Sequence, residues 1–334
     1  MDSKTAIRYT KRKIRRILRV GVTLCIILGP LFAKSTISAE TLTETGILAP
    51  VQGPEDPAII AVRDALLVDN FTSARAGIKV LFQKSQKSGQ AEYWAGVLCL
   101  RTGASDDAIR YLRASQKLKD NAYTDEALAL AYYSARQFKL FLALMSRANQ
   151  RMPSNFAPYY YLGRYYVSVE VADFQRAEVL LSKAIQYDPT NARSIYYLAL
   201  CQESAGGLEK AESSYKQVLN MPHASPHYLD LAELGLARVT MSTNRHAEAF
   251  IHAQKVEAAL PQEVEAHTIL ARLYAERGDS QKAVSEWKVA KSLDPTNTSA
   301  YYNLYRLYLR AGDKTLADEA FKQYKAISKL YGTD

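Results

Sequence analysis

Two neighbouring stretches decide the fold: residues 267–297, HTILARLYAERGDSQKAVSEWKVAKSLDPTN, and residues 301–331, YYNLYRLYLRAGDKTLADEAFKQYKAISKLY. They align without a gap at an offset of 34 residues. In each stretch, apolar residues follow one face of a helix, a glycine (Gly278 or Gly312) ends that helix, and a second apolar stripe follows. Self-similarity at such a period is the sequence signature of a repeat architecture.

The same register continues toward the N-terminus. If Ala283 is numbered as position 20 of a unit, position 20 recurs at intervals of 33 to 38 residues, on Ala74, Ala108, Phe141, Ala177, Ala211, Ala249, Ala283 and Ala317. Small residues also recur at position 8, so the two helices of a unit can approach closely. The sequence therefore predicts eight helix–turn–helix units over residues 55–331, in which Phe141 departs from the small-residue rule.

Four prolines mark the end of the second helix in their units, since proline removes a backbone donor and disfavours helix in the residue before it: Pro153, Pro189, Pro261 and Pro295. With this pattern the chain resembles a tetratricopeptide repeat protein over about four-fifths of its length. The resemblance implies an all-α, right-handed superhelical α-solenoid of about eight repeats. Stacked hairpins bury the apolar stripes that a single hairpin leaves exposed.

The formal charge of +9 is concentrated at the N-terminus. Residues 1–39 hold nine Lys or Arg against one acid, whereas the remainder holds 34 basic and 33 acidic residues. Because the body is nearly neutral, we expect no nucleic-acid partner.

The N-terminal segment has the pattern of an export signal. Its basic block precedes fourteen uncharged residues, 20–33, fewer than the roughly 20 apolar residues that span a membrane. We expect a signal peptide over 1–39, cut after Ala39, or else an uncleaved N-terminal anchor, which would be the only contact with a membrane. A linker over 40–54 and a tail over 332–334 complete the expected domains. The folded part is expected to be exported, in the periplasm or elsewhere outside the cytoplasm.

The resemblance also implies a concave groove lined by positions 2, 5, 9, 12 and 13 of each first helix. Here tyrosine and arginine recur at these positions and predict a groove for an extended or acidic segment of a protein partner, because guanidinium groups bind carboxylates bidentately. The alternative is an ordinary solvated face, since arginine is a good helix former. No unit has asparagine at position 9, so the family's carboxylate clamp is not expected. The predicted groove residues are Arg63, Tyr93, Tyr160, Arg164, Tyr196, Arg238, Arg272, Tyr302, Arg306 and Arg310.

No arrangement of side chains predicts catalysis, so we expect the protein not to be an enzyme. The five histidines lie between residues 223 and 267. His267 occupies position 4, a packing position usually filled by an aromatic residue, and Pro226 interrupts the pair His223 and His227. We expect neither a cofactor nor a metal site, because a metal needs three or four ligands.

These features predict a non-catalytic interaction scaffold of the cell envelope that supports assembly of an envelope complex. The alternative is a glycan- or peptidoglycan-binding accessory of an envelope polysaccharide system, in which tyrosines stack on sugars. Self-association through an apolar C-terminal edge, formed by Ile327, Leu330 and Tyr331, is a further prediction.

Overall fold

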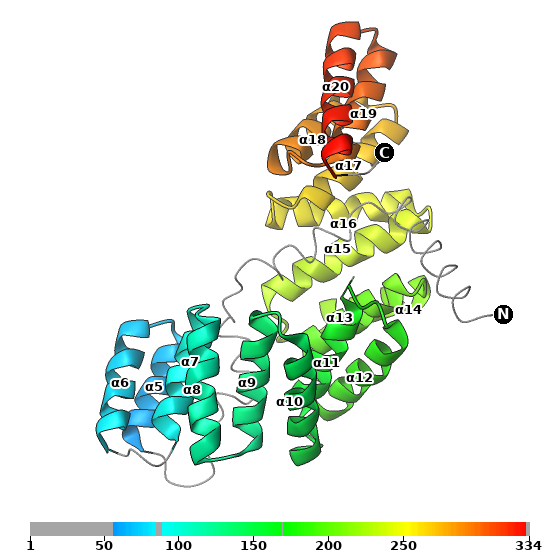
Figure 1. Cartoon of the computed structure of the whole chain (residues 1–334). Helices are drawn as coiled ribbons and strands as arrows, with labels where there is room; N and C mark the ends of the chain where they lie inside the picture. The colour runs from blue at the N-terminus through cyan, green and yellow to red at the C-terminus, as the bar shows by residue number, and fades with distance from the viewer. Residues whose placement is uncertain (1–55, 85–88, 169, 332–334) are drawn as a thin grey trace, which may run out of the picture. The chain divides into compact units, whose positions relative to one another are not determined.

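The computed structural model describes residues 56–84, 89–168 and 170–331, which form sixteen α-helices and no strand (Figure 1). The expected signal peptide, linker and C-terminal tail lie outside these described residues. The first helices of the repeats are α5 (Pro57–Leu67), α7 (Gln90–Arg101), α9 (Ala122–Ser134), α11 (Phe156–Val167), α13 (Ala192–Ser204), α15 (Pro226–Ser242), α17 (Val264–Glu276) and α19 (Thr298–Ala311). The second helices are α6 (Phe71–Lys84), α8 (Ser105–Leu118), α10 (Phe138–Arg151), α12 (Phe174–Tyr187), α14 (Leu208–Leu219), α16 (His246–Ala259), α18 (Ser280–Leu293) and α20 (Lys314–Tyr331).

These helices pair as the repeat register predicts. In seven of the repeats the first and second helices pack against each other, as in α9 with α10 or α17 with α18, and a second helix also contacts the first helix of the next repeat, as in α8 with α9 or α16 with α17. The predicted all-α architecture of repeated helix hairpins is therefore confirmed. Across the described ranges, none of the helices has both the length and the apolar character that crossing a membrane requires.

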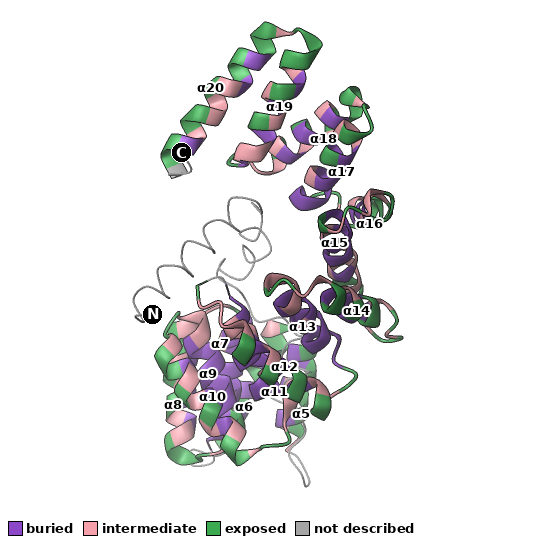
Figure 2. Ribbon diagram, turned by 90° about the vertical axis from the view of Figure 1, so that its right-hand side faces the viewer, coloured by how far each residue is buried: buried purple, intermediate pink, exposed green. Residues whose placement is uncertain are grey.

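The described residues divide into two compact units, an N-terminal unit ending at Tyr197 and a C-terminal unit starting at Leu198. The boundary lies within α13. In both units, the first helices are the more buried: α9 and α13 are largely buried, whereas α20 is mostly exposed (Figure 2).

Close helix packing defines each hairpin. All eight residues at position 20 are 0% exposed, including Phe141, whose ring contacts those of Tyr133 and Tyr165. A Cβ added to Gly96 at position 8 would lie 2.5 Å from Cγ of Leu112, at position 24 of the same unit. This approach is closer than real Cβ contacts allow, so the small residue sets the distance between the helices.

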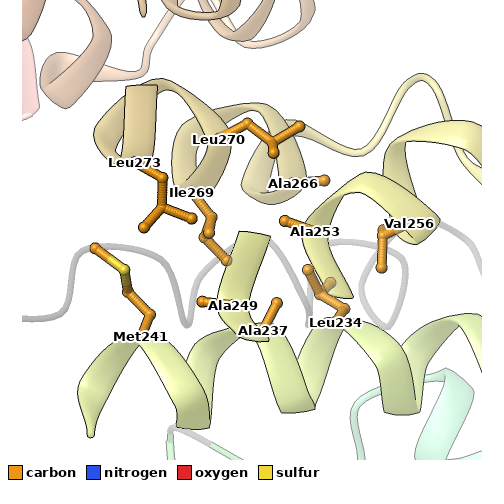
Figure 3. Close-up of a cluster of buried hydrophobic side chains, with 10 residues drawn as sticks. All are labelled: Leu234, Ala237, Met241, Ala249, Ala253, Val256, Ala266, Ile269, Leu270 and Leu273. Atoms are coloured by element: carbon orange, nitrogen blue, oxygen red, sulfur yellow. The ribbon is translucent and has the colours of Figure 1, made fainter. Parts of the chain in front are cut away.

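Consecutive hairpins share a continuous core. Figure 3 shows one such cluster, in which side chains from α15, α16 and α17 point toward one another. Leu270 and Ala253 are both 0% exposed and come from two successive repeats. The cluster consists of Leu234, Ala237, Met241, Ala249, Ala253, Val256, Ala266, Ile269, Leu270 and Leu273.

The turn inside each hairpin has a left-handed residue at position 15. Four of these residues are glycines, including Gly278 and Gly312, which the sequence predicts as helix ends, and four are not glycine. Ala172 is one of the latter, with φ of 48°. A Cβ in this region is strained. The eight residues are Asp69, Gly103, Arg136, Ala172, Gly206, Asn244, Gly278 and Gly312.

Replacing Ala172 with glycine should therefore stabilise the protein, by about 0.5–1 kcal/mol, because glycine adopts a positive φ without strain. The same substitution at Ala143, an exposed residue inside α10, should destabilise it by about 1 kcal/mol, since glycine disfavours a helix interior. Urea denaturation of the two variants and the wild type measures both effects. A decrease in stability for Ala172→Gly as large as that for Ala143→Gly would contradict the assignment of strain.

Candidate functional site

The ten predicted groove residues are divided between the two units. Five belong to the N-terminal unit, namely Arg63, Tyr93, Tyr160, Arg164 and Tyr196. The other five belong to the C-terminal unit, namely Arg238, Arg272, Tyr302, Arg306 and Arg310. The two sets differ in exposure and in contacts.

In the N-terminal unit the predicted residues are largely covered. Tyr160 and Tyr196 are each 2% exposed, and both rings meet the ring of Tyr197 edge to face. The Arg164 guanidinium lies over the rings of Tyr133 and Tyr197, 6.0 and 5.4 Å from their centroids. Burial raises the pKa of Tyr160 to about 12, so its hydroxyl remains protonated. These residues form an aromatic and cation–π cluster; their predicted role in binding a partner stays a prediction.

The other two members also have partners on their own helices. Arg63 Nε lies 3.9 Å from Asp64 Oδ1, and the Tyr93 ring meets Trp94 with centroids 5.4 Å apart. A buried acid lies in the same row of positions: Glu126, at position 5 of its repeat, is 0% exposed, and burial raises its pKa well above the ordinary value. Asn155 Nδ2 donates to Glu126 Oε2 at 3.4 Å.

In the C-terminal unit, Arg238 is held by carboxylates of its own chain. Its Nε and Nη2 donate to the two oxygens of Glu203 at 2.7 and 2.8 Å, and its Nη1 donates to Glu265 Oε2 at 3.2 Å. Tyr215 Oη donates to Glu203 Oε2 at 2.7 Å. The arginine clamp formed by Arg238, Glu203 and Glu265 therefore joins α15, α13 and α17, and only 11% of the Arg238 side chain is exposed.

The clamp contains two carboxylates for one guanidinium. Burial opposes the charge of Arg238, but the carboxylates of Glu203 and Glu265 raise its pKa well above the ordinary value. Burial raises the pKa of Glu265 to about 7, and the charge of Arg238 offsets only part of that effect. Glu265 therefore changes its protonation state near neutral pH.

The remaining four residues reach the surface. Arg272 on α17 and Arg306 and Arg310 on α19 are exposed, and none of the three has a hydrogen bond or an ion pair within the described part of the chain. Tyr302 is 41% exposed, and its ring lies 5.4 Å from that of Tyr324. Tyr302, Arg306 and Arg310 are spaced by four residues, which puts them along one side of the helix. We refer to Arg272, Tyr302, Arg306 and Arg310 as the exposed arginine face.

The fold brings together three titratable residues that no sequence pattern predicts as a group. Glu257 on α16, His267 on α17 and Glu286 on α18 each offer a ligand atom, and these atoms all lie within 4.8 Å of one another. His267 is 4% exposed, as its packing position predicts. The two acids are 10 and 19 residues away in the sequence, so no local motif indicated the group. The available signal was a histidine at position 4, where Tyr159 and Tyr301 stand in other repeats.

Two of the three residues of the predicted C-terminal edge can be placed, and the side chain of Tyr331 lies outside the described part of the chain. Leu330 is 79% exposed and Ile327 is half-buried. Self-association through this edge stays a prediction.

Comparison with known proteins identifies the repeat. The tetratricopeptide repeat family matches residues 169–234. Tetratricopeptide repeat protein 37 of Xenopus laevis is 28% identical over 294 residues, which are 82% of this chain and 18% of that protein. The CTR9 homolog of Arabidopsis thaliana is 28% identical over 148 residues, 44% of this chain and 14% of that protein. The chain thus spans less than a fifth of the length of either relative.

Solved structures share the fold. The Cut9–Hcn1 hetero-tetramer of the APC/C superposes with a TM-score of 0.63 at 13% identity, over 87% of this chain and 54% of the matched chain. The C-terminal part of a TPR repeat-containing protein from Cytophaga hutchinsonii gives a TM-score of 0.53 at 20% identity, over 74% of this chain and 98% of that one. Together, the family match and the shared fold support a tetratricopeptide repeat protein.

Replacing Glu265 with glutamine should flatten the pH dependence of stability between about pH 5 and pH 7.5. The native protein keeps Glu265 protonated up to its pKa of about 7, whereas the unfolded chain releases this proton near 4.5. The native state therefore binds more protons in this window, and the free energy of unfolding of the wild type falls as pH rises, with up to about 3 kcal/mol arising from Glu265. Glutamine does not titrate, so the variant loses this component.

Urea denaturation of the wild type and the variant at about pH 5 and pH 7.5 measures how much the free energy of unfolding changes between the two pH values. Glu209→Gln is the matched control, because Glu209 is an exposed acid of the same unit, and it should keep the wild-type pH dependence. Equal pH dependence in Glu265→Gln and the wild type would refute the role given to Glu265.

Proposed function

We propose that this protein is a non-catalytic scaffold that binds an acidic segment of a protein partner through the exposed arginine face. Tetratricopeptide repeat proteins serve as protein–protein interaction scaffolds, and the fold described here is of that kind. The observation that carries the proposal is the contrast between two arginines at the same repeat position: Arg238 is bound by two carboxylates, whereas Arg272 is exposed and has no such partner.

The repeat register explains this contrast. The carboxylates that hold Arg238 come from position 12 of the preceding repeat, Glu203, and from position 2 of the following repeat, Glu265. For Arg272 the same two positions hold Met241 and Ser299, neither of which is acidic. Arg272 therefore keeps a guanidinium group available for a carboxylate outside the chain.

Arg306 and Arg310 extend the positive surface along α19. An acidic segment bound there would form charge-assisted hydrogen bonds, which are stronger than hydrogen bonds between neutral groups. Arginine can form two of them at once with a single carboxylate. Tyr302 adds a rigid ring with a polar end, and Tyr and Arg are the residues that most often dominate binding energy at interfaces. The glycan-binding alternative draws on the same ring, since Tyr302 is exposed beside Tyr305 and Tyr324.

A random peptide library selected on the purified protein should yield binders rich in Asp and Glu. Changing Arg272, Arg306 and Arg310 together to glutamate should weaken the binding of a selected peptide at least about tenfold, because attraction becomes repulsion. Fluorescence anisotropy with a labelled peptide measures the dissociation constant. Added salt should also weaken binding by the wild type, since exposed charges are screened.

The matched control changes Lys288, Lys314 and Lys322 to glutamate. These lysines are exposed on the second helices α18 and α20, and the substitution alters the net charge by the same amount. This control should leave the affinity within about threefold of wild type. Equal losses in both triple variants would show that net charge alone, and not the exposed arginine face, attracts the peptide. Selection of no acidic peptide would also count against the proposal and would favour the glycan alternative.

We propose further that the scaffold works outside the cytoplasm, in support of an envelope complex. The support for this location is the sequence of residues 1–39, with its basic block and uncharged run.

The mature protein should begin at Glu40 when the full sequence is expressed in a bacterial host with a periplasm. N-terminal sequencing of the C-terminally tagged product measures this directly. Changing both Ile26 and Ile27 to arginine should abolish processing, because two charges interrupt the apolar run. A product that starts at Met1 and remains with the membrane would instead establish the uncleaved anchor.

A further inference from the structure

Three repeats begin their first helix with the same hydrogen bond. The side chain at position 4 reaches the carbonyl oxygen of the proline six residues earlier: Tyr159 Oη donates to Pro153 O at 3.2 Å, and Tyr301 Oη donates to Pro295 O at 3.2 Å. In the seventh repeat His267 takes this position, with Nε2 3.0 Å from Pro261 O. A carbonyl oxygen can only accept, so Nε2 carries a hydrogen and the histidine tautomer is fixed.

Histidine brings a second nitrogen that tyrosine lacks. Nδ1 of His267 lies 2.7 Å from Glu286 Oε2, and Glu257 completes a group whose three ligand atoms are all within 4.8 Å of one another. The three residues come from α17, α18 and α16. Packing and the bond to Pro261 explain a ring at position 4, but they do not explain two carboxylates around Nδ1.

The charge balance distinguishes this group from the pair formed by His252 and Glu233, which also belongs to the C-terminal unit. Glu233 contacts His252 and also receives a hydrogen bond from Lys255 Nζ at 2.7 Å, so its negative charge has a fixed cation. Around His267 the third member is an acid instead. In the described part of the chain, the charges that act on His267 come from Glu286 and Glu257, and those that act on Glu257 come from Glu286 and His267.

The excess negative charge affects both partners. Burial, and then the charge of Glu286, raise the pKa of Glu257. The hydrogen bond with Glu286 raises the pKa of His267, with a further contribution from the Pro261 carbonyl. A cation placed between these groups would be stabilised by both carboxylates.

We infer that Glu257, His267 and Glu286 form a binding site for a divalent transition-metal ion of the Zn²⁺ class. Imidazole and carboxylate donors suit zinc. Donation of the other ring N–H to a backbone carbonyl is the outer contact typical of metal-binding histidines, because it orients the ring and fixes the tautomer. Three protein ligands leave a coordination position for water. The metal would replace the proton shared by Nδ1 and Glu286, and it would link two successive hairpins independently of any partner.

Isothermal titration of the full chain with ZnCl₂ tests the site. All proteins should carry His223→Ala and His227→Ala, which remove an exposed pair of histidines. In this background we expect one Zn²⁺ per chain, with a dissociation constant on the order of micromolar near pH 7.5 and at least tenfold weaker near pH 5.5, because protons compete for the ligands. Co²⁺ should give visible absorption bands on binding.

His267→Tyr is the decisive variant. It restores the residue found at position 4 of two other repeats and can keep the bond to Pro261, so the fold should be preserved, as circular dichroism and melting without metal will show. It removes Nδ1 and should weaken Zn²⁺ binding at least about tenfold. His252→Gln removes a histidine of the same unit and should leave binding unchanged.

Two results would overturn the inference. One is Zn²⁺ binding by a folded His267→Tyr protein with the affinity of the parent. The other is the absence of zinc binding and of cobalt bands in the parent background itself, which would leave His267 as an imidazolium held between two acids.

Discussion

The close approach of two helices at positions 8, 20 and 24 is the constraint on which the rest of the structure depends. Every position 20 is fully buried, and the leucines opposite Gly96 and Gly163 leave no room for a Cβ. Protein interiors are packed as densely as organic crystals, so such a contact fixes the helix pair in one arrangement. That arrangement determines which positions of the first helix remain for other neighbours or for solvent.

Whether an arginine at position 9 is held by contacts within the chain or is exposed depends on the side chains of the neighbouring repeats. Arg238 meets Glu203 at position 12 of the repeat before it, and Arg164 meets the ring of Tyr133 at the corresponding position. Position 12 before Arg272 is Met241, which offers neither a charge nor an aromatic face. The arginines of this periodic row are therefore held by contacts within the chain at some repeats and exposed at others.

The sequence was sufficient for the hairpins, because their signals lie within one period: the alanines of position 20, the prolines and the apolar stripes. Contacts between repeats were beyond it, since Glu203 and Glu265 lie 35 and 27 residues from Arg238. Glycine as a signal finds only half of the left-handed turn residues. The other half are not glycine but adopt the same conformation, namely Asp69, Arg136, Ala172 and Asn244. The division into two units has no counterpart in the repeat pattern.

A repeat can gain a new ligand atom at a position where packing accepts more than one kind of side chain. In three repeats position 4 holds a flat ring with one donor directed at the proline carbonyl, and both tyrosine and histidine make this contact. The exchange to His267 keeps the backbone contact and adds Nδ1. Glu286 alone would satisfy this nitrogen. Glu257 contributes a negative charge that neither packing nor hydrogen bonding requires, and this surplus separates the group from the His252 pair, where Lys255 supplies the cation.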